Sequence, residues 1–116
     1  MNKVSFNLKN EKYVGFTAVG HTGYAEHGKD IVCAAVSVLT QSTANALEYF
    51  IGLNNLQVEV KDGELKVSVA ASLDENAQHD AQVLMHSLYL GLTNLEDTYP
   101  QHIKIGKQEV DSDAKN

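Results

Sequence analysis

Two long segments with helical apolar periodicity, each preceded by a pair of alternating segments, constrain the fold of this chain most strongly. In residues 30–51 the apolar positions recur every three or four residues, at Val32, Val36, Leu39, Ala46, Leu47, Phe50 and Ile51. The second stripe comprises Ala77, Ala81, Leu84, Leu88, Leu92 and Leu95. Gly52 ends the first helix and Tyr99-Pro100 ends the second. Each helix therefore presents one apolar face that a sheet can cover.

The segments around these helices alternate apolar and polar residues, which is typical of strands with one covered face. They are residues 4–8, 13–19, 56–60 and 65–69 and a short last strand at Ile103 and Ile105. Asp62-Gly63 predicts a two-residue hairpin. The order ββαββαβ predicts a two-layer α+β fold, a mainly antiparallel sheet with two helices on one face. A single domain is expected over residues 1–107, followed by a polar tail over residues 108–116.

Both predicted helices carry candidate caps. Asp30 precedes the first apolar run and is of a residue type that commonly occupies the cap position. Ser72 and Glu75 have the spacing of a capping box ahead of the second run. The sequence therefore predicts a first helix that starts after Asp30 and a second that starts after Ser72.

Charge and cysteine content exclude several functional classes. The 116 residues carry 15 acidic and 9 basic side chains, for a net charge of −6. This balance argues against nucleic-acid binding through a basic face but suits a basic protein partner. One cysteine rules out an internal disulfide and suits a reducing compartment. With neither a signal-peptide pattern nor a run of ~18 apolar residues, we expect a cytoplasmic protein whose partner is neither membrane nor nucleic acid.

The candidate chemistry lies around the only cysteine, Cys33. It is placed at the start of a predicted helix, where the N-terminus favours thiolate over thiol. His21 lies where a strand ends, and glycines at positions 20, 23 and 28 let the intervening loop bring the imidazole to the sulfur. The pair predicts acyl transfer, with His21 moving the proton and backbone N–H groups at the helix start holding the oxyanion. The alternative is a buried, packing cysteine and an unrelated loop histidine.

The other polar residues of this stretch have two candidate roles each. Asp30 either caps the helix, accepting from a backbone N–H between Ile31 and Cys33, or orients His21. Ser37 follows Cys33 by four residues on the same helical face, and either supports the site or bonds a carbonyl one turn back. The residues of the intervening loop form either a mobile wall for substrate or a solvated loop. They are Gly23, Tyr24, Glu26, His27 and Gly28.

The sequence predicts no metal and no cofactor. His21, His27, Asp30 and Cys33 are of metal-binding types, but their spacing fits no compact zinc template and a second cysteine is lacking. The glycines near residue 20 form neither a phosphate loop nor a dinucleotide fingerprint.

This stretch also resembles a known family. Gly20-His21-Thr22-Gly23-Tyr24, Gly28 and Asp30-Ile31-Val32-Cys33-Ala34-Ala35-Val36-Ser37 are similar to the signature of the bacterial ribosomal-processing cysteine proteases, the Prp family. The length, the order of elements and the acidic balance also resemble those of the family. The C-terminal half matches in general layout.

The resemblance implies a cytoplasmic, homodimeric cysteine endopeptidase that removes a short N-terminal extension from the precursor of bacterial large-subunit ribosomal protein twenty-seven, a step needed for ribosome assembly. It implies that Cys33 is the nucleophile and that His21 assists it, with less defined roles for Asp30 and Ser37. The resemblance also implies a dimer in which helices of the two subunits pack against each other. On the second helix, Tyr89 and Leu92 lie near an apolar face that we expect the sheet to leave partly uncovered.

Two hypotheses from different classes follow. The first is a cysteine endopeptidase with a Cys33–His21 dyad. The second is a non-catalytic, ribosome-associated binding module in which Cys33 only packs. The substitution Cys33→Ala separates them, because only the endopeptidase loses cleavage of a precursor protein.

Overall fold

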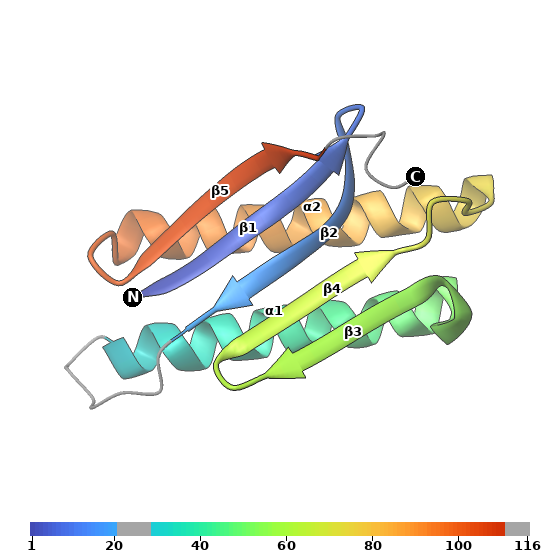
Figure 1. Ribbon diagram of the computed structural model, residues 1–116. Coiled ribbons are helices and arrows are strands. Elements are labelled where there is room, and N and C mark those ends of the chain that lie inside the picture. Colours follow the sequence, from blue (N-terminus) through green and yellow to red (C-terminus); the bar gives the residue numbers. More distant parts are fainter. Residues whose placement is uncertain (21–28, 111–116) are drawn as a thin grey trace.

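The computed structural model of the chain describes residues 1–20 and 29–110, and for residues 29 and 30 it describes the backbone alone. Its elements follow the predicted order ββαββαβ (Figure 1). They are β1 (Asn2–Lys9), β2 (Lys12–Val19), α1 (Lys29–Ile51), a short 3₁₀ turn η1 (Leu53–Asn55), β3 (Leu56–Lys61), β4 (Glu64–Val69), α2 (Glu75–Thr98) and β5 (Ile103–Glu109).

The five strands form one sheet in the order β3-β4-β2-β1-β5. Its neighbours are antiparallel except for β1 and β5, which run parallel because α2 crosses over between the β3–β4 hairpin and β5. Both helices cover the same face of the sheet (Figure 1). The predicted two-layer α+β fold with a mainly antiparallel sheet is therefore confirmed.

The core lies between the sheet and the two helices. In the register of β1 and β2, Val4 is opposite Ala18 and Phe6 is opposite Phe16, so these side chains point toward the helices together. The largest fully buried side chains come from both layers: Val4, Phe6, Phe16, Val32, Leu47, Val67, Met85, Leu92 and Ile103. Leu92, expected near an uncovered apolar face, is fully buried, and Tyr89 packs against Phe6 with ring centroids 5.5 Å apart. Leu92 therefore belongs to the core, whereas Val83 and Leu90 on the same helix are 52% and 51% exposed, so part of the apolar surface of α2 is left uncovered.

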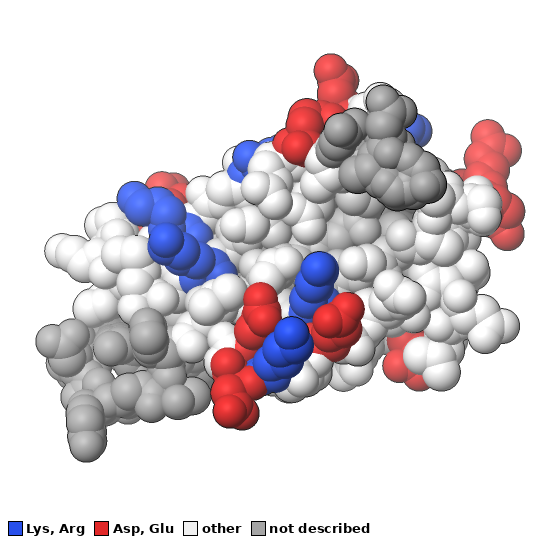
Figure 2. Space-filling view, in the orientation of Figure 1, with Lys and Arg blue, Asp and Glu red and all other residues white. Residues whose placement is uncertain are grey.

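The opposite face of the sheet is open and polar. On β3 and β4, Glu59 is opposite Lys66 and Lys61 is opposite Glu64, so charges of opposite sign alternate across the two strands. Figure 2 shows the interspersed lysines and acids on this face. Such cross-strand pairs stabilise a hairpin modestly and keep the face hydrophilic. The sheet therefore has one covered and one solvated side, as the alternating strand pattern predicted.

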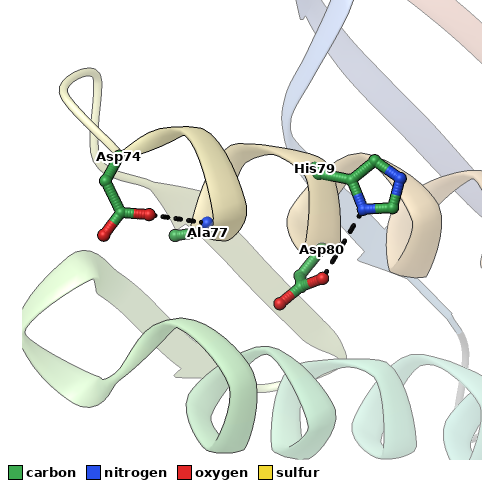
Figure 3. A network of polar contacts seen from close by, with 4 residues as sticks. All are labelled: Asp74, Ala77, His79 and Asp80. Atoms are coloured by element: carbon green, nitrogen blue, oxygen red, sulfur yellow. Dashed lines mark hydrogen bonds and ion pairs between the residues drawn. The ribbon is translucent and has the colours of Figure 1, made fainter.

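The helix starts differ from the predicted ones. Helix α1 begins at Lys29, so Asp30 is its second residue and does not hold the cap position. At α2 the cap is Asp74, whose carboxylate accepts a 2.8 Å hydrogen bond from the backbone N–H of Ala77 (Figure 3). The predicted capping box at Ser72 was therefore wrong, because the chain turns into the helix two residues later. Within the described residues, neither helix is apolar enough over its length to cross a membrane.

The C-terminal strand is longer than its two isoleucines indicated. β5 pairs with β1 as far as Glu109, which is opposite Leu8. The N–H of Val110 donates to the carbonyl oxygen of Leu8 at 2.7 Å. Residues 108 and 109, assigned to the polar tail from sequence, therefore belong to the sheet. The sequence pattern does not reveal this extension, because β5 is an edge strand with polar residues on both faces.

Candidate active site

Cys33 lies where α1 meets the first residues of the sheet. It is the fifth residue of the helix, and its side chain is half-buried. The Nδ2 group of Asn2, at the start of β1, donates a hydrogen bond of 3.3 Å to Cys33 Sγ. Asn2 itself is only 4% exposed. The thiol is therefore held against a buried amide that is 31 residues away in sequence.

The position of Asn2 is fixed by its backbone. Its N–H donates to the carbonyl oxygen of His102 at 3.0 Å, and its Cα is opposite Ile103 in the parallel pairing with β5. Asn2 has the same parity along β1 as Val4, so its side chain points toward the helix layer. The strand register therefore delivers one polar side chain to the otherwise apolar inner face of β1, directly beneath the start of α1.

Gly20 lies against the oxygen of the Asn2 side-chain amide. Its N–H donates to the carbonyl oxygen of Gly63 at 2.9 Å, which ties the end of β2 to the β3–β4 turn. A Cβ atom on Gly20 would collide with Oδ1 of Asn2. A side chain at residue 20 would therefore displace the Asn2 amide.

A hollow of about 220 Å³ opens next to Cys33. It lies between α1, the end of β2 and the β3–β4 hairpin, and is lined by Asn2, Ala18, Val19, Gly20, Cys33, Val36, Ser37, Thr40, Gln41, Val60, Lys61, Gly63, Glu64 and Leu65. Apolar side chains such as Val36 and Leu65 alternate in this lining with polar ones such as Gln41 and Glu64. The hollow can therefore receive part of a peptide with its reacting carbonyl near the sulfur.

Two hydroxyl residues of α1 line the same hollow. Ser37 is exposed and lies one turn after Cys33, as the helical spacing predicted. Thr40 is 2% exposed, and its Oγ1 donates to the carbonyl oxygen of Val36 at 2.7 Å. The Thr40 hydroxyl is thus occupied by the helix backbone, whereas Ser37 faces the opening.

The remaining residues predicted for the site lie outside the described part of the chain. These are His21 and the loop residues Gly23, Tyr24, Glu26, His27 and Gly28. The side chain of Asp30 is likewise outside it. The contact between His21 and Cys33 and the role of Asp30 therefore stay predictions.

The start of α1 changes the expected source of oxyanion donors. In a helix that begins at Lys29, the N–H groups without an intrahelical partner end before Cys33. The N–H of Cys33 belongs to the hydrogen-bond ladder of α1 instead. The backbone of Asp30 lies inside the helix, as its second residue. Donors for an oxyanion must therefore come from residues before Cys33 or from side chains near the sulfur.

Asn2 is the residue at this site that the sequence interpretation missed. The sequence carries a signal for it: Asn2 precedes Val4, Phe6 and Leu8 at the same two-residue spacing, so it is a polar residue on the inward face of an alternating strand. A polar residue buried on that face needs a hydrogen-bond partner, which here is Cys33. In the described residues, no group of three or more His, Cys, Asp and Glu side chains is arranged to hold a metal ion.

Comparison with known proteins decides the family. The sequence model of a family described as cysteine protease Prp matches residues 1–104. The chain belongs to this family of cysteine proteases. The ribosomal processing cysteine protease Prp of Bacillus subtilis is 29% identical over 93 residues, which cover 79% of this chain and 83% of that protein. The protein of the same name from Staphylococcus aureus is 28% identical over 90 residues, covering 74% and 78%.

Solved structures agree with this assignment. A crystal structure from Streptococcus mutans matches with a TM-score of 0.75 at 28% identity, over 95% of this chain and 96% of that one. The Prp protease of S. aureus, crystallised in complex with a substrate peptide, matches with a TM-score of 0.75 at 23% identity, over 93% and 100%. At 23% identity, the S. aureus structure supports the fold assignment alone. Membership of the Prp family therefore favours the cysteine protease over the non-catalytic binding module.

Proposed function

We propose that this Prp family member cleaves a peptide bond with Cys33 as nucleophile and His21 as general acid and base. The observation that carries the proposal is the placement of the only cysteine, half-buried and hydrogen-bonded at the rim of an open hollow of about 220 Å³. Family membership supports the reaction class, and the spacing of the Gly-His and Asp-Ile-Val-Cys motifs supports the pairing with His21.

The reaction proceeds in two steps. The Cys33 thiolate attacks the scissile carbonyl carbon and forms a C–S bond, and the C–N bond breaks as His21 donates a proton to the leaving amine. Water then attacks the thioester carbonyl while His21 accepts its proton, the C–S bond breaks, and the acid product leaves with the Cys33 thiolate and protonated His21 restored. Asp30 and Ser37 are supporting residues in this proposal. The variants Asp30→Asn and Ser37→Ala are expected to lower kcat/KM without removing cleavage.

The proposed substrate is the precursor of bacterial large-subunit ribosomal protein twenty-seven, from which the enzyme removes a short N-terminal extension. The relatives from B. subtilis and S. aureus are named ribosomal processing proteases, which supports this class of substrate. Ribosomal proteins are basic, and a net charge of −6 attracts a basic partner over distance. In this proposal residues 23–28 form a wall over the bound peptide.

We also propose that the enzyme is a cytoplasmic homodimer of single-domain subunits. Support for the dimer comes from the outward side of α1, where Ile31, Val38 and Tyr49 are exposed at helical spacings of seven and eleven residues. We call these three residues the α1 face. Val60 on β3, at the hollow, is a further exposed apolar residue. Apolar side chains in this number favour a protein partner over solvent.

Cleavage assays with matched controls test the nucleophile and the histidine. Cys33→Ala and His21→Ala are expected to fold normally and to lose cleavage of the precursor protein by at least about a hundredfold. Ser42→Ala, on an exposed position of the same helix, and His79→Ala, on the exposed side of α2, serve as controls and should cleave at the wild-type rate. Full activity of folded Cys33→Ala would disprove the nucleophile, and full activity of folded His21→Ala would remove the histidine from the mechanism.

A further inference from the structure

We propose that Asn2 is a positioning residue for the Cys33 thiol, whose side-chain amide aims the sulfur at the hollow and stabilises its ionised form. This inference rests on the proposed role of Cys33 as nucleophile. It assigns a function to a residue outside the Gly20–Ser37 motif, on a different element of the fold. The geometric basis is the 3.3 Å hydrogen bond from Asn2 Nδ2 to Cys33 Sγ.

The direction of this hydrogen bond determines its chemical effect. An amide NH₂ group only donates, so sulfur is the acceptor. A thiolate accepts a hydrogen bond more strongly than a neutral thiol, because the bond is then assisted by charge. The geometry therefore places a buried donor where a negatively charged sulfur would use it most.

The surroundings of Asn2 hold the amide in one orientation. Its backbone is anchored to His102, and its Oδ1 lies against Gly20, where a side chain would collide with it. A side chain that is 4% exposed and confined in this way has little rotamer freedom to lose when the sulfur ionises. The donor is therefore preorganised, which is what stabilisation of a developing charge requires.

The helix itself supplies less stabilisation at this position than a cysteine at the helix terminus would receive. Cys33 is the fifth residue of α1, and the favourable effect of a helix N-terminus falls off within the first turn. The N–H of Cys33 is part of the helix ladder. A side-chain donor from another element therefore takes over part of the role usually played by the helix start.

The charged side chains that the structure describes around the hollow differ in kind from this donor. Among the described residues that line the hollow, the charged ones are Lys61 on β3 and Glu64 on β4. They are opposite each other in the hairpin register and have opposite signs, so their effects on the sulfur partly cancel. From β5, His102 contributes a backbone oxygen to the anchoring of Asn2.

The pH profile of alkylation tests this inference, because the rate of reaction with iodoacetamide follows the thiolate fraction. The chain has a single cysteine, so the signal reports Cys33 alone. In Asn2→Leu and Asn2→Asp, both of similar shape to the native side chain, the NH₂ donor is absent. We expect the midpoint of the profile to rise by about one pH unit in Asn2→Leu, with alkylation at pH 7 about tenfold slower, and to rise further in Asn2→Asp, whose carboxylate also repels the thiolate.

The matched control is Asn7→Asp, the same chemical change five residues further along β1. Asn7 accepts a hydrogen bond from Gln108 through Oδ1, which an aspartate retains, and it lies on the open face of the sheet. This variant should keep the wild-type midpoint. For the Asn2 variants, cleavage of the precursor protein should show a lower kcat with KM changed less than about twofold, since the loss is confined to the reacting group.

Thermal melts separate a positioning role from a structural one. An Asn2 variant that melts at a lower temperature but keeps the wild-type alkylation midpoint would overturn the inference. If Asn2→Leu does not fold, Asn2→Asp and Asn2→Ser, whose shorter side chain cannot reach the sulfur, carry the same test. Failure of this inference can be told apart from failure of the proposed function. Cleavage by Cys33→Ala would refute Cys33 as the nucleophile. The alkylation profile of the Asn2 variants is measured without any cleavage reaction.

Discussion

Asn2 and Gly20 fit against each other at one end of the sheet, so that Oδ1 of Asn2 occupies the space that a side chain on residue 20 would need. Gly20 lacks the positive φ angle that usually selects glycine, unlike Gly52 and Gly63. The sequence interpretation explained Gly20 by the freedom of the following loop. In the structure its requirement is space for a neighbouring amide.

The variant Gly20→Ala is expected to displace the Asn2 amide. The added methyl group would force the side chain or the end of β2 to move, which costs about 1–3 kcal/mol of folding stability. It would also lengthen the hydrogen bond to Cys33, so alkylation at neutral pH should slow. Chemical denaturation and the iodoacetamide rate measure the two effects.

Two further variants control for this result. Gly106→Ala places a methyl group on β5 where no atom lies within 4 Å, and it should leave both quantities unchanged. In the double variant Asn2→Ser/Gly20→Ala the collision is relieved, so Gly20→Ala should cost less stability there than in the native background. Equal costs in both backgrounds would show that the two residues do not interact.

The position of Cys33 near the start of a helix could be predicted from the sequence, but its immediate surroundings could not. Local motif spacing places Cys33 near the start of a helix, and that was confirmed. Its partner Asn2 comes from another element, brought to the helix only by the register of β1 against β5. Register between distant strands follows from the packing of the whole core, and a single sequence does not fix it.

The fold could be predicted to the level of elements and layers, since both helices and the hairpin have strong periodic or turn signals. The boundaries were less reliable, as the cap at Asp74 and the extension of β5 to Glu109 illustrate. Phe50, assigned to the buried stripe of α1, is 54% exposed, whereas Ile51 beside it is buried. How much of an apolar stripe is covered depends on the neighbouring elements.

The cap of α2 gives a direct test of the helix boundary. Asp74→Ala removes the acceptor for the N–H of Ala77 and should destabilise the protein by about 1 kcal/mol. For a domain of this size, the melting temperature should fall by about 4 °C. Ser72→Ala, at the position that the sequence pattern favoured, should have little effect. A larger loss of stability in Ser72→Ala than in Asp74→Ala would show that the capping box at Ser72 forms.

Gln82 on α2 fixes the far end of β2. Its Oε1 accepts from the N–H of Tyr13 at 2.7 Å and its Nε2 donates to the Tyr13 carbonyl at 2.8 Å. Gln82→Ala leaves both backbone groups beside the buried Tyr13 without this partner, and should cost about 1–3 kcal/mol in denaturant unfolding. Gln78→Ala, one turn earlier on α2, is the control. Alkylation of Cys33 should be unaffected by either change, because this contact lies at the opposite end of β2.

The α1 face provides the last prediction, which concerns the proposed dimer. Val38 is 64% exposed and Tyr49 is 83% exposed, so neither is needed to fold the subunit. A charge buried between two copies would be costly, and Val38→Asp or Tyr49→Asp should therefore convert the dimer into monomers of unchanged melting profile at low concentration. Leu90→Asp, which alters a comparably exposed apolar residue on α2, should leave the dimer intact. Sedimentation measures the mass, and a wild-type mass for both α1 variants would place the interface elsewhere.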